Sequence, residues 1–138
     1  MIEKTVPPKI AIVDDDRIMR TVLGALIRDS GYTVVSEAGD GKEAIRQYLL
    51  HQPDILFMDI EMPDVDGMTA LKAIKAYGTN CQVVMISATA TQSIVKEAVE
   101  NGAAGFLVKP ISAGKVQDAI ASCLKRAHQQ QGEMLIFD

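Results

Sequence analysis

The chain has 138 residues, which is enough for one domain with a single hydrophobic core and too few for two domains of ordinary size. Its net charge of -4, with no dense run of lysine or arginine, argues against direct DNA binding. No apolar stretch approaches the roughly 18 residues of a membrane-spanning helix, and the first residues lack the hydrophobic region of a signal peptide. We therefore expect a cytoplasmic protein that does not enter a membrane.

Short apolar runs alternate along the chain with longer segments of helical periodicity, which is typical of strand and helix units repeated around a parallel sheet. The predicted strands are Lys9 to Val13, Thr33 to Glu37, Ile55 to Met58, Gln82 to Ile86 and Gly105 to Val108. The predicted helices are about Arg17 to Ser30, a segment that opens at Asp40 and carries Ala44 to Leu49, Gly67 to Tyr77, Gln92 to Asn101 and Ser112 to Ala127. We therefore predict an α/β fold of the doubly wound, flavodoxin-like class, with a five-stranded parallel sheet between helices.

The two ends of the chain fall outside this pattern. We divide the sequence into an N-terminal arm at 1–8, a folded domain at 9–127 and a C-terminal tail at 128–138. In the tail, a glutamine run and Gly132 predict a flexible connection to the apolar MLIF segment. We expect this segment to pack back on the domain or to be loosely ordered, with a docking peptide or the start of a linker as alternatives.

Side chains capable of chemistry stand at the ends of four predicted strands. They are Asp14 and Asp15 after the first strand, Asp59 after the third, Ser87 after the fourth and Lys109 after the fifth. Ligand sites of open parallel sheets lie outside the carboxyl ends of the strands, so these side chains should meet. In the strand order 2-1-3-4-5 the first and third strands are neighbours about 4.8 Å apart, whereas the order 3-2-1-4-5 would separate Asp59 from Asp15 by roughly 10 Å. We predict the order 2-1-3-4-5.

Crowded carboxylates repel each other, and a divalent cation would remove that conflict. Oxygen ligands without a nearby histidine or cysteine suit Mg²⁺, with Mn²⁺ as an alternative. Lys109 adds a positive charge for a phosphoryl oxygen, and the Ser87 hydroxyl adds a donor. This set fits phosphoryl transfer to an aspartate. Cys81 and Cys123 have no CxxC spacing and are expected to be small buried apolar residues.

At these positions the sequence resembles the receiver domain of two-component response regulators, and its size is similar to that of the single-domain, CheY-like members. The resemblance covers about Lys9 to Ala127. Its motifs are the acid pair Asp14-Asp15, the segment DIEMPDVDG that starts at Asp59, the pair Ser87-Ala88 and the pair Lys109-Pro110.

The resemblance implies roles for the acidic residues. Asp59 would be the phosphoacceptor, taking a phosphoryl group from a sensor histidine kinase or a histidine phosphotransfer protein. Asp15 would bind Mg²⁺ directly, Asp14 largely through water, and the backbone carbonyl of Glu61 together with Asp59 would complete the protein's share of the ligands. The protein would then be a phosphorylated switch that acts on itself and not an enzyme with a separate substrate.

The resemblance also implies how the switch works. Lys109 would pair with the phosphoryl group, and the Lys109–Pro110 peptide bond would be cis. The Ser87 hydroxyl would turn toward the phosphoryl group, and Phe106 would rotate inward, so that phosphorylation favours one of two packings. Glu61 and Thr89 would flank the path of water to the phosphoryl group, and we expect their substitution to change the rate of dephosphorylation.

Partner surfaces are implied in the same way. Signalling would use the face made by the fourth helix, the fifth strand and the fifth helix to contact a downstream protein, and a phosphorylation-dependent homodimer stays open. The side of the first helix that carries Ile18 and Met19 would dock the kinase.

Two other functions stay open from the sequence. The run IAIVDDDRI also resembles phosphatases of the haloacid dehalogenase type, with Asp14 as nucleophile and Asp16 as acid or base. That family needs an acidic pair beyond the lysine, and between Lys109 and Glu133 the sequence offers only Asp118, in a predicted helix. A receiver-like scaffold that is never phosphorylated is the third possibility. Asp16 itself is predicted to cap the first helix.

Overall fold

A computed structural model describes residues 6–128 and 134–138, which form one parallel β-sheet with helices on both faces. The strands are β1 (Lys9–Val13), β2 (Thr33–Ala38), β3 (Ile55–Asp59), β4 (Gln82–Ser87), β5 (Gly105–Val108) and β6 (Leu135–Phe137). Their order in the sheet is β2-β1-β3-β4-β5-β6. The predicted order of the first five strands is correct, whereas the predicted number of strands is one too few.

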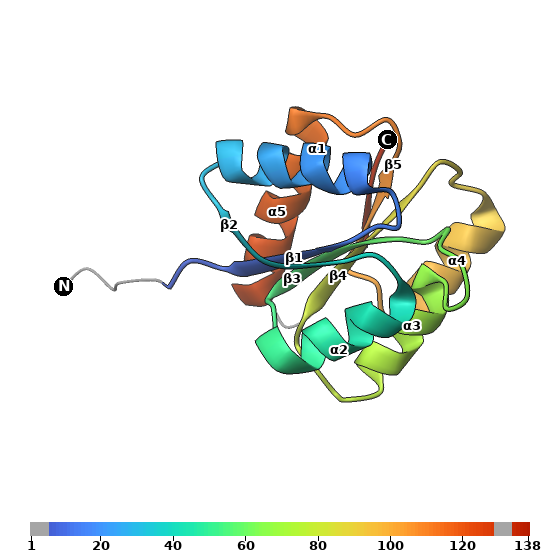
Figure 1. The fold of residues 1–138 in the computed structure, drawn as a ribbon. Coiled ribbons are helices and arrows are strands. Elements are labelled where there is room, and N and C mark those ends of the chain that lie inside the picture. The colour runs from blue at the N-terminus through green and yellow to red at the C-terminus, as the bar shows by residue number, and fades with distance from the viewer. Residues whose placement is uncertain (1–5, 129–133) are drawn as a thin grey trace.

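The helices are α1 (Arg17–Asp29), α2 (Gly41–His51), α3 (Gly67–Lys75), α4 (Gln92–Glu100) and α5 (Ala113–His128). Helices α1 and α5 cover one face of the sheet, and α2, α3 and α4 cover the other (Figure 1). The predicted elements are all present, with ends that differ by at most two residues.

The core consists of two apolar clusters, one on each face of the sheet. Successive strand residues point to opposite faces, so Ile10 and Ile12 pack with α1 and α5 while Ala11 and Val13 pack with the other helices. All five residues of β3 are buried, as expected for a central strand that is covered on both faces. Within the described residues, no helix is both long enough and apolar enough to cross a membrane.

Aspartates begin three of the helices. The carboxylates of Asp16, Asp40 and Asp66 accept hydrogen bonds from backbone amides in the first turns of α1, α2 and α3, at 2.9, 2.7 and 2.8 Å. These bonds satisfy amides that have no partner within the helix. The prediction that Asp16 caps the first helix is therefore confirmed.

The apolar end of the tail forms the sixth strand. β6 pairs in parallel with β5, with Leu135 beside Gly105 and Phe137 beside Leu107. Met134 packs against the cluster under α2 to α4, and Phe137 packs against the cluster under α1 and α5. The expectation that the MLIF segment packs back on the domain is confirmed, whereas its strand structure was not predicted. The predicted flexible connection, like positions 1–5 of the predicted arm, lies outside the described residues.

Gly67, at the first position of α3, lies against the backbone of β3. A Cβ atom there would come within 2.1 Å of the Asp59 carbonyl oxygen, so the backbone would have to move. We expect Gly67→Ala to lower the free energy of unfolding by about 1–3 kcal/mol, the usual cost of an overpacked site, measured by urea denaturation.

Gly114→Ala is the matched control, because Gly114 also lies in the first turn of a helix and a Cβ atom added there would meet no other part of the protein within 4 Å. There the alanine should be neutral or stabilising by up to about 1 kcal/mol. Equal stabilities for the two variants would contradict the close-approach argument.

Candidate functional site

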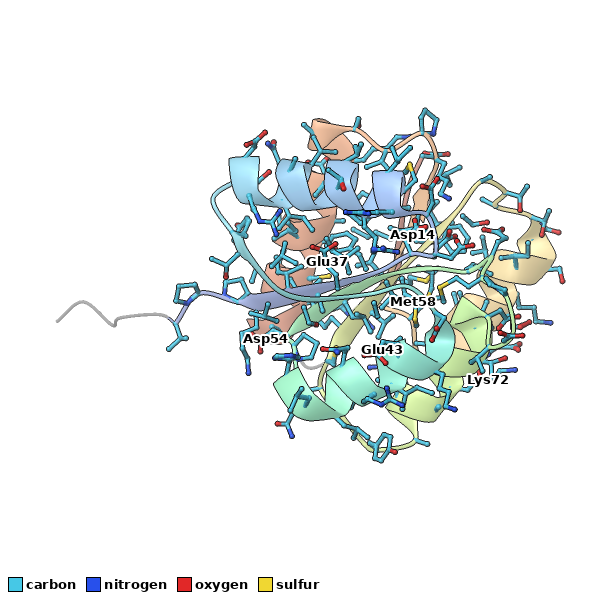
Figure 2. The ribbon with its side chains drawn as sticks, viewed as in Figure 1. Asp14, Glu37, Glu43, Asp54, Met58 and Lys72 are labelled. Atoms are coloured by element: carbon cyan, nitrogen blue, oxygen red, sulfur yellow. The ribbon has the colours of Figure 1, made fainter. Side chains whose placement is uncertain are left out.

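Three carboxylates meet at the carboxyl edge of the sheet. Asp14 follows β1, Asp15 comes next in the chain, and Asp59 is the last residue of β3. One carboxylate oxygen from each of the three lies within 4.8 Å of the others. Asp14 and Asp59 are 1% and 3% exposed, and Asp15 is exposed. Figure 2 shows Asp14 at this edge and Asp54 at the opposite one.

Every polar atom of Asp14 except one carboxylate oxygen makes a hydrogen bond. Its amide donates to the carbonyl of Ala38 at 3.1 Å, and its carboxylate Oδ1 accepts from the amide of Asp16 at 2.8 Å. Its Oδ2 is buried and has no hydrogen-bond partner among residues 6–128 and 134–138. A buried carboxylate oxygen without a donor is costly, so this atom calls for a cation or a bound water.

Asp59 is held more loosely. Its Oδ1 accepts from the amide of Glu61 at 3.3 Å, and its Oδ2 lies 3.3 Å from the Lys109 ammonium. Both distances are long for hydrogen bonds to a charged group. The carboxylate of Asp59 is therefore close to a positive charge but is not held by a short hydrogen bond to it.

Burial and repulsion make these acids hard to ionise. Burial, together with the nearby charge of Asp14, raises the pKa of Asp59 to about 7, although Lys109 opposes this shift. Burial also raises the pKa of Asp14. For Lys109, burial disfavours the ammonium form, but the charge and hydrogen bond of Asp59, together with the charges of Asp14 and Glu61, outweigh burial and raise the pKa. Without a cation, the pocket therefore keeps a proton near neutral pH.

The donor set fits a small divalent cation. Ligands on opposite sides of Mg²⁺ lie about 4.2 Å apart, so carboxylate oxygens within 4.8 Å of one another need only a small shift to share the ion. The unpartnered Oδ2 of Asp14 adds a second, independent indication. Carboxylate oxygens without histidine or cysteine suit a hard cation.

Ser87, the last residue of β4, is fully buried and lies next to this pocket. Its hydroxyl donates to the carboxylate of Glu61 at 2.6 Å, and it accepts from the amide of Thr89 at 3.1 Å. Lys109, beyond the end of β5, is joined to β4 because its amide donates to the Ser87 carbonyl at 2.9 Å. The Lys109–Pro110 peptide bond is cis, as predicted.

Two features of the site were not predicted from the sequence. The first is the bond between the side chains of Ser87 and Glu61, since Glu61 had been assigned only a backbone ligand and a place beside the path of water. The second is Arg20, on α1, whose guanidinium donates to the carbonyl of Asp14. Neither contact has a signal in the spacing of residues, because each depends on how a long side chain turns.

Phe106 lies in the middle of β5 and is fully buried. Its ring belongs to the apolar cluster under α2, α3 and α4. Phe106 is thus part of the core on this face of the sheet, and its rotation on phosphorylation stays a prediction.

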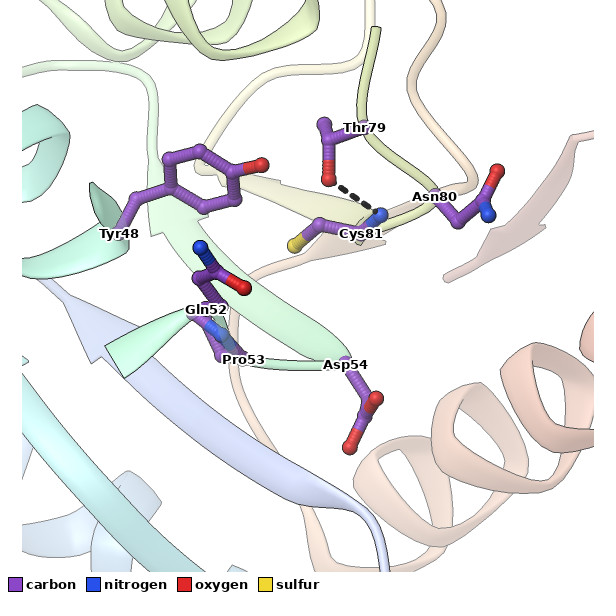
Figure 3. A pocket seen from close by; sticks show the side chains of 7 residues that line it. All are labelled: Tyr48, Gln52, Pro53, Asp54, Thr79, Asn80 and Cys81. Atoms are coloured by element: carbon purple, nitrogen blue, oxygen red, sulfur yellow. Dashed lines mark hydrogen bonds between the residues drawn. The ribbon is translucent and has the colours of Figure 1, made fainter. Parts of the chain in front are cut away.

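A cavity of about 190 Å³ lies at the amino edge of the sheet, between the end of α2 and the start of β4 (Figure 3). Tyr48, Gln52 and Cys81 are among the residues that line it. Burial raises the pKa of the Cys81 thiol to about 12, so this cysteine is not a nucleophile at neutral pH. The buried cysteines Cys81 and Cys123 thus behave as the apolar residues that the sequence predicted.

Comparisons with known proteins agree with this geometry. The sequence model of the response regulator receiver domain matches residues 10–121. Chemotaxis protein CheY of Bacillus subtilis (strain 168) is 42% identical over 116 residues, which cover 84% of this chain and 97% of that protein. Chemotaxis protein CheY of Thermotoga maritima is 39% identical over 112 residues, which cover 81% of this chain and 93% of that protein.

Solved structures give the same result. The CheX-CheY-BeF3-Mg complex from Borrelia burgdorferi matches with a TM-score of 0.83 and 35% identity, covering 86% of this chain and 90% of that one. The signal receiver domain of the putative response regulator NarL from Mycobacterium tuberculosis matches with a TM-score of 0.82 and 32% identity, covering 86% of this chain and 97% of that one.

In the metal-free protein, we expect the free energy of unfolding to fall as pH rises from about 4 to about 7. Folding raises the pKa of Asp59 from 3.8 to about 7, so in this interval the folded state binds more protons than the unfolded state. Stability then decreases with rising pH. Thermal unfolding followed by circular dichroism in the presence of EDTA measures the effect.

Addition of Mg²⁺ should raise the unfolding temperature, and more at pH 8 than at pH 5, because the cation binds the ionised carboxylates. Asp59→Asn should flatten the metal-free pH dependence. Asp118→Asn, the same change at an exposed position on α5, should leave it as in the wild type. A pH dependence that Asp59→Asn does not alter would contradict the assignment.

Proposed function

Because the chain belongs to the response regulator receiver domain family and is a response regulator of two-component signalling, we propose that Asp59 is the residue that becomes phosphorylated. The observation that carries this proposal is the position of Asp59, whose carboxylate lies within 4.8 Å of those of Asp14 and Asp15 and 3.3 Å from the Lys109 ammonium. The acceptor is thus the one carboxylate of the three that also contacts an ammonium group among the described residues.

The proposed reaction is a transfer of a phosphoryl group from a phosphohistidine of a partner protein. A carboxylate oxygen of Asp59 forms a bond to phosphorus while the bond between phosphorus and the imidazole nitrogen breaks. The electron pair of that bond stays on the imidazole, which then takes up a proton from solvent. The product is an aspartyl phosphate on this chain.

Lys109 and Ser87 are proposed to stabilise the transferred group. The Lys109 side chain is 27% exposed, and its ammonium group reaches Asp59 without another side-chain hydrogen bond in the described residues, so it can move to a phosphoryl oxygen. The Ser87 hydroxyl can donate to another oxygen once it leaves Glu61. Charge-assisted hydrogen bonds of this kind are strong in a site that excludes water.

The proposed cation ligands are Asp14, Asp15, Asp59 and the backbone carbonyl of Glu61. Mg²⁺, or Mn²⁺ in its place, would supply positive charge to the phosphoryl oxygens during transfer. The unpartnered Oδ2 of Asp14 supports this assignment. Asp14 and Asp15 would hold the cation, and Asp59 would be kept ionised by it at neutral pH.

A phosphatase of the haloacid dehalogenase type is disfavoured. Its acid or base would be Asp16, but the Asp16 carboxylate accepts from the amide of Ile18 and caps α1. A scaffold that is never phosphorylated has no physical need for a lysine beside buried acids. The receiver function uses each of these groups.

The partners are proposed from the exposed apolar residues. Ile18 on α1 is 73% exposed, and the adjoining surface is proposed to dock a sensor histidine kinase or a histidine phosphotransfer protein. The face of α4, β5 and α5 is proposed to contact a downstream protein or a second phosphorylated copy. Here β6 lies along β5, so that surface would include Leu135 and Ile136, which are 48% and 43% exposed. The cytoplasmic location and the domain limits of 9–127 stay predictions.

Incubation with acetyl phosphate and Mg²⁺, followed by intact-mass spectrometry, tests the acceptor. We expect one added phosphoryl group in the wild type and none in Asp59→Asn. Asp16→Ala should still be phosphorylated, although the loss of its cap should lower the free energy of unfolding by about 1 kcal/mol. A phosphoryl group on Asp14 would favour the phosphatase, and no incorporation would favour the scaffold.

The bond between Ser87 and Glu61 should oppose the phosphorylated state, because Ser87 cannot donate to Glu61 and to a phosphoryl oxygen at once. We expect Glu61→Ala to bind beryllofluoride, a phosphoryl mimic, roughly tenfold more tightly, equivalent to about 1.4 kcal/mol for a lost charge-assisted bond. Calorimetric titration in saturating Mg²⁺ measures this change.

Thr89→Ala provides the comparison, because its backbone amide still donates to Ser87 and the bond to Glu61 is kept. Its beryllofluoride affinity should match that of the wild type. Both variants should change the rate at which the aspartyl phosphate is lost, since both residues flank the proposed path of water. Equal affinities in all three proteins would show that the Ser87–Glu61 bond does not oppose the switch.

A further inference from the structure

Arg20 connects helix α1 to the loop that carries the acid pair. It lies in the first turns of the helix, and its guanidinium turns back toward the sheet. Its Nη1 donates to the backbone carbonyl of Asp14. The side chain is 20% exposed, so most of it is removed from solvent.

This bond acts on the peptide group between Asp14 and Asp15. The amide of Asp14 is already held by Ala38, and its carboxylate Oδ1 is held by the amide of Asp16. With the carbonyl of Asp14 held by Arg20, the plane of the Asp14–Asp15 peptide is fixed, because a peptide group is rigid. The direction in which Asp15 leaves the backbone follows from that plane.

Arg20 is itself held in place from the neighbouring strand. Its Nε lies 3.8 Å from the carboxylate of Glu37 on β2. Gly39, just beyond β2, leaves room for the guanidinium, since a Cβ atom there would lie 3.3 Å from Nη1. Arg28, on the same helix, lies 3.9 Å from the same glutamate but is 54% exposed. The two arginines therefore share Glu37, and the bond to the Asp14 carbonyl comes from Arg20.

We propose that Arg20 is a positioning residue for the cation site, which orients Asp15 and Asp14 through the Asp14 carbonyl. The proposal rests on the proposed function, because it assumes that these acids bind Mg²⁺. Groups behind the ligands of a metal typically orient them and strengthen binding in this way. The planar fork of an arginine suits the task, since one nitrogen can hold the carbonyl while another faces Glu37.

The sign of the effect separates positioning from simple electrostatics. Arg20 is a positive charge close to a site for a positive ion, so its charge alone disfavours binding of Mg²⁺. If Arg20 acted only through its charge, removing it would tighten Mg²⁺ binding. If Arg20 positions the ligands, removing it weakens binding despite the lost repulsion.

The test is a calorimetric titration of the full chain with Mg²⁺ alone. We expect Arg20→Met to raise the dissociation constant about tenfold, within the range seen for residues that orient metal ligands. Arg20→Lys should give a smaller increase, since an ammonium group can still donate to the Asp14 carbonyl but lacks the second nitrogen that faces Glu37. Arg28→Met removes the same charge from the same helix and the other partner of Glu37, and it should leave the dissociation constant within about twofold of the wild type.

A second measurement separates positioning from loss of fold. The rate of phosphorylation by acetyl phosphate, followed as a function of Mg²⁺ concentration, should show a half-saturating concentration about tenfold higher in Arg20→Met with little change in the maximal rate. Circular dichroism of each variant establishes that it is folded.

Several results would overturn the proposal. Unchanged or tighter binding in Arg20→Met would mean that Arg20 does not position the acids. An equal loss in Arg28→Met would assign the effect to the packing of α1 and not to the bond between Arg20 and Asp14. If the wild type itself failed to bind Mg²⁺, the proposed cation site would be wrong, and this outcome is distinct from a failure confined to Arg20.

Discussion

Asp14 and Asp59 are buried side by side, and burial together with the charge of Asp14 makes Asp59 harder to ionise. Their position follows from the register of two neighbouring strands, in which Val13 pairs with Met58 and the residue after each of them is an aspartate. A pair of buried like charges is unfavourable in a core that otherwise consists of close-packed apolar side chains. Several of the polar contacts at the carboxyl edge of the sheet reduce the cost of burying these two carboxylates.

The groups that contact the two acids come from different elements of the fold. Lys109, beyond β5, brings a positive charge to Asp59, and the amide of Asp16 donates to Asp14. Arg20 holds the peptide group between Asp14 and Asp15 without binding the carboxylate of either residue. None of these contacts reaches Oδ2 of Asp14, so in the described part of the chain the cost of burying the two carboxylates is reduced but not removed. Binding of a cation, or of a phosphoryl group together with a cation, would stabilise these unsatisfied carboxylates. A switch needs this kind of stabilisation, because the ligand then favours one of its two conformations.

The sequence was sufficient to predict most of the architecture, because apolar periodicity and strand-end chemistry are local signals. The strands, the helices and the order of the first five strands were predicted from these signals, and the cis bond before Pro110 was predicted from the resemblance to receiver domains. The sixth strand was not, since three residues are too few to show alternation and their partner, β5, lies about 30 positions earlier. The bonds of Arg20 to Asp14 and of Ser87 to Glu61 were also missed. They depend on side-chain rotamers and on packing, about which a single sequence carries no periodic signal.

The sixth strand also brings Asp138 to one particular edge of the sheet. Helix α5 runs to the amino edge, where Leu124 and Ala127 lie near residues 6–9. β6 then returns in parallel with β5, and Phe137 lies beside Leu107, two residues before Lys109. Asp138 therefore lies on the side of the acceptor, while residues 6–8 lie at the opposite edge (Figure 1). A fluorescent label or a second domain fused after Asp138 would start at the same edge of the sheet as Asp59, three strands away from it, whereas a fusion at the other end of the chain would join the domain at the opposite edge.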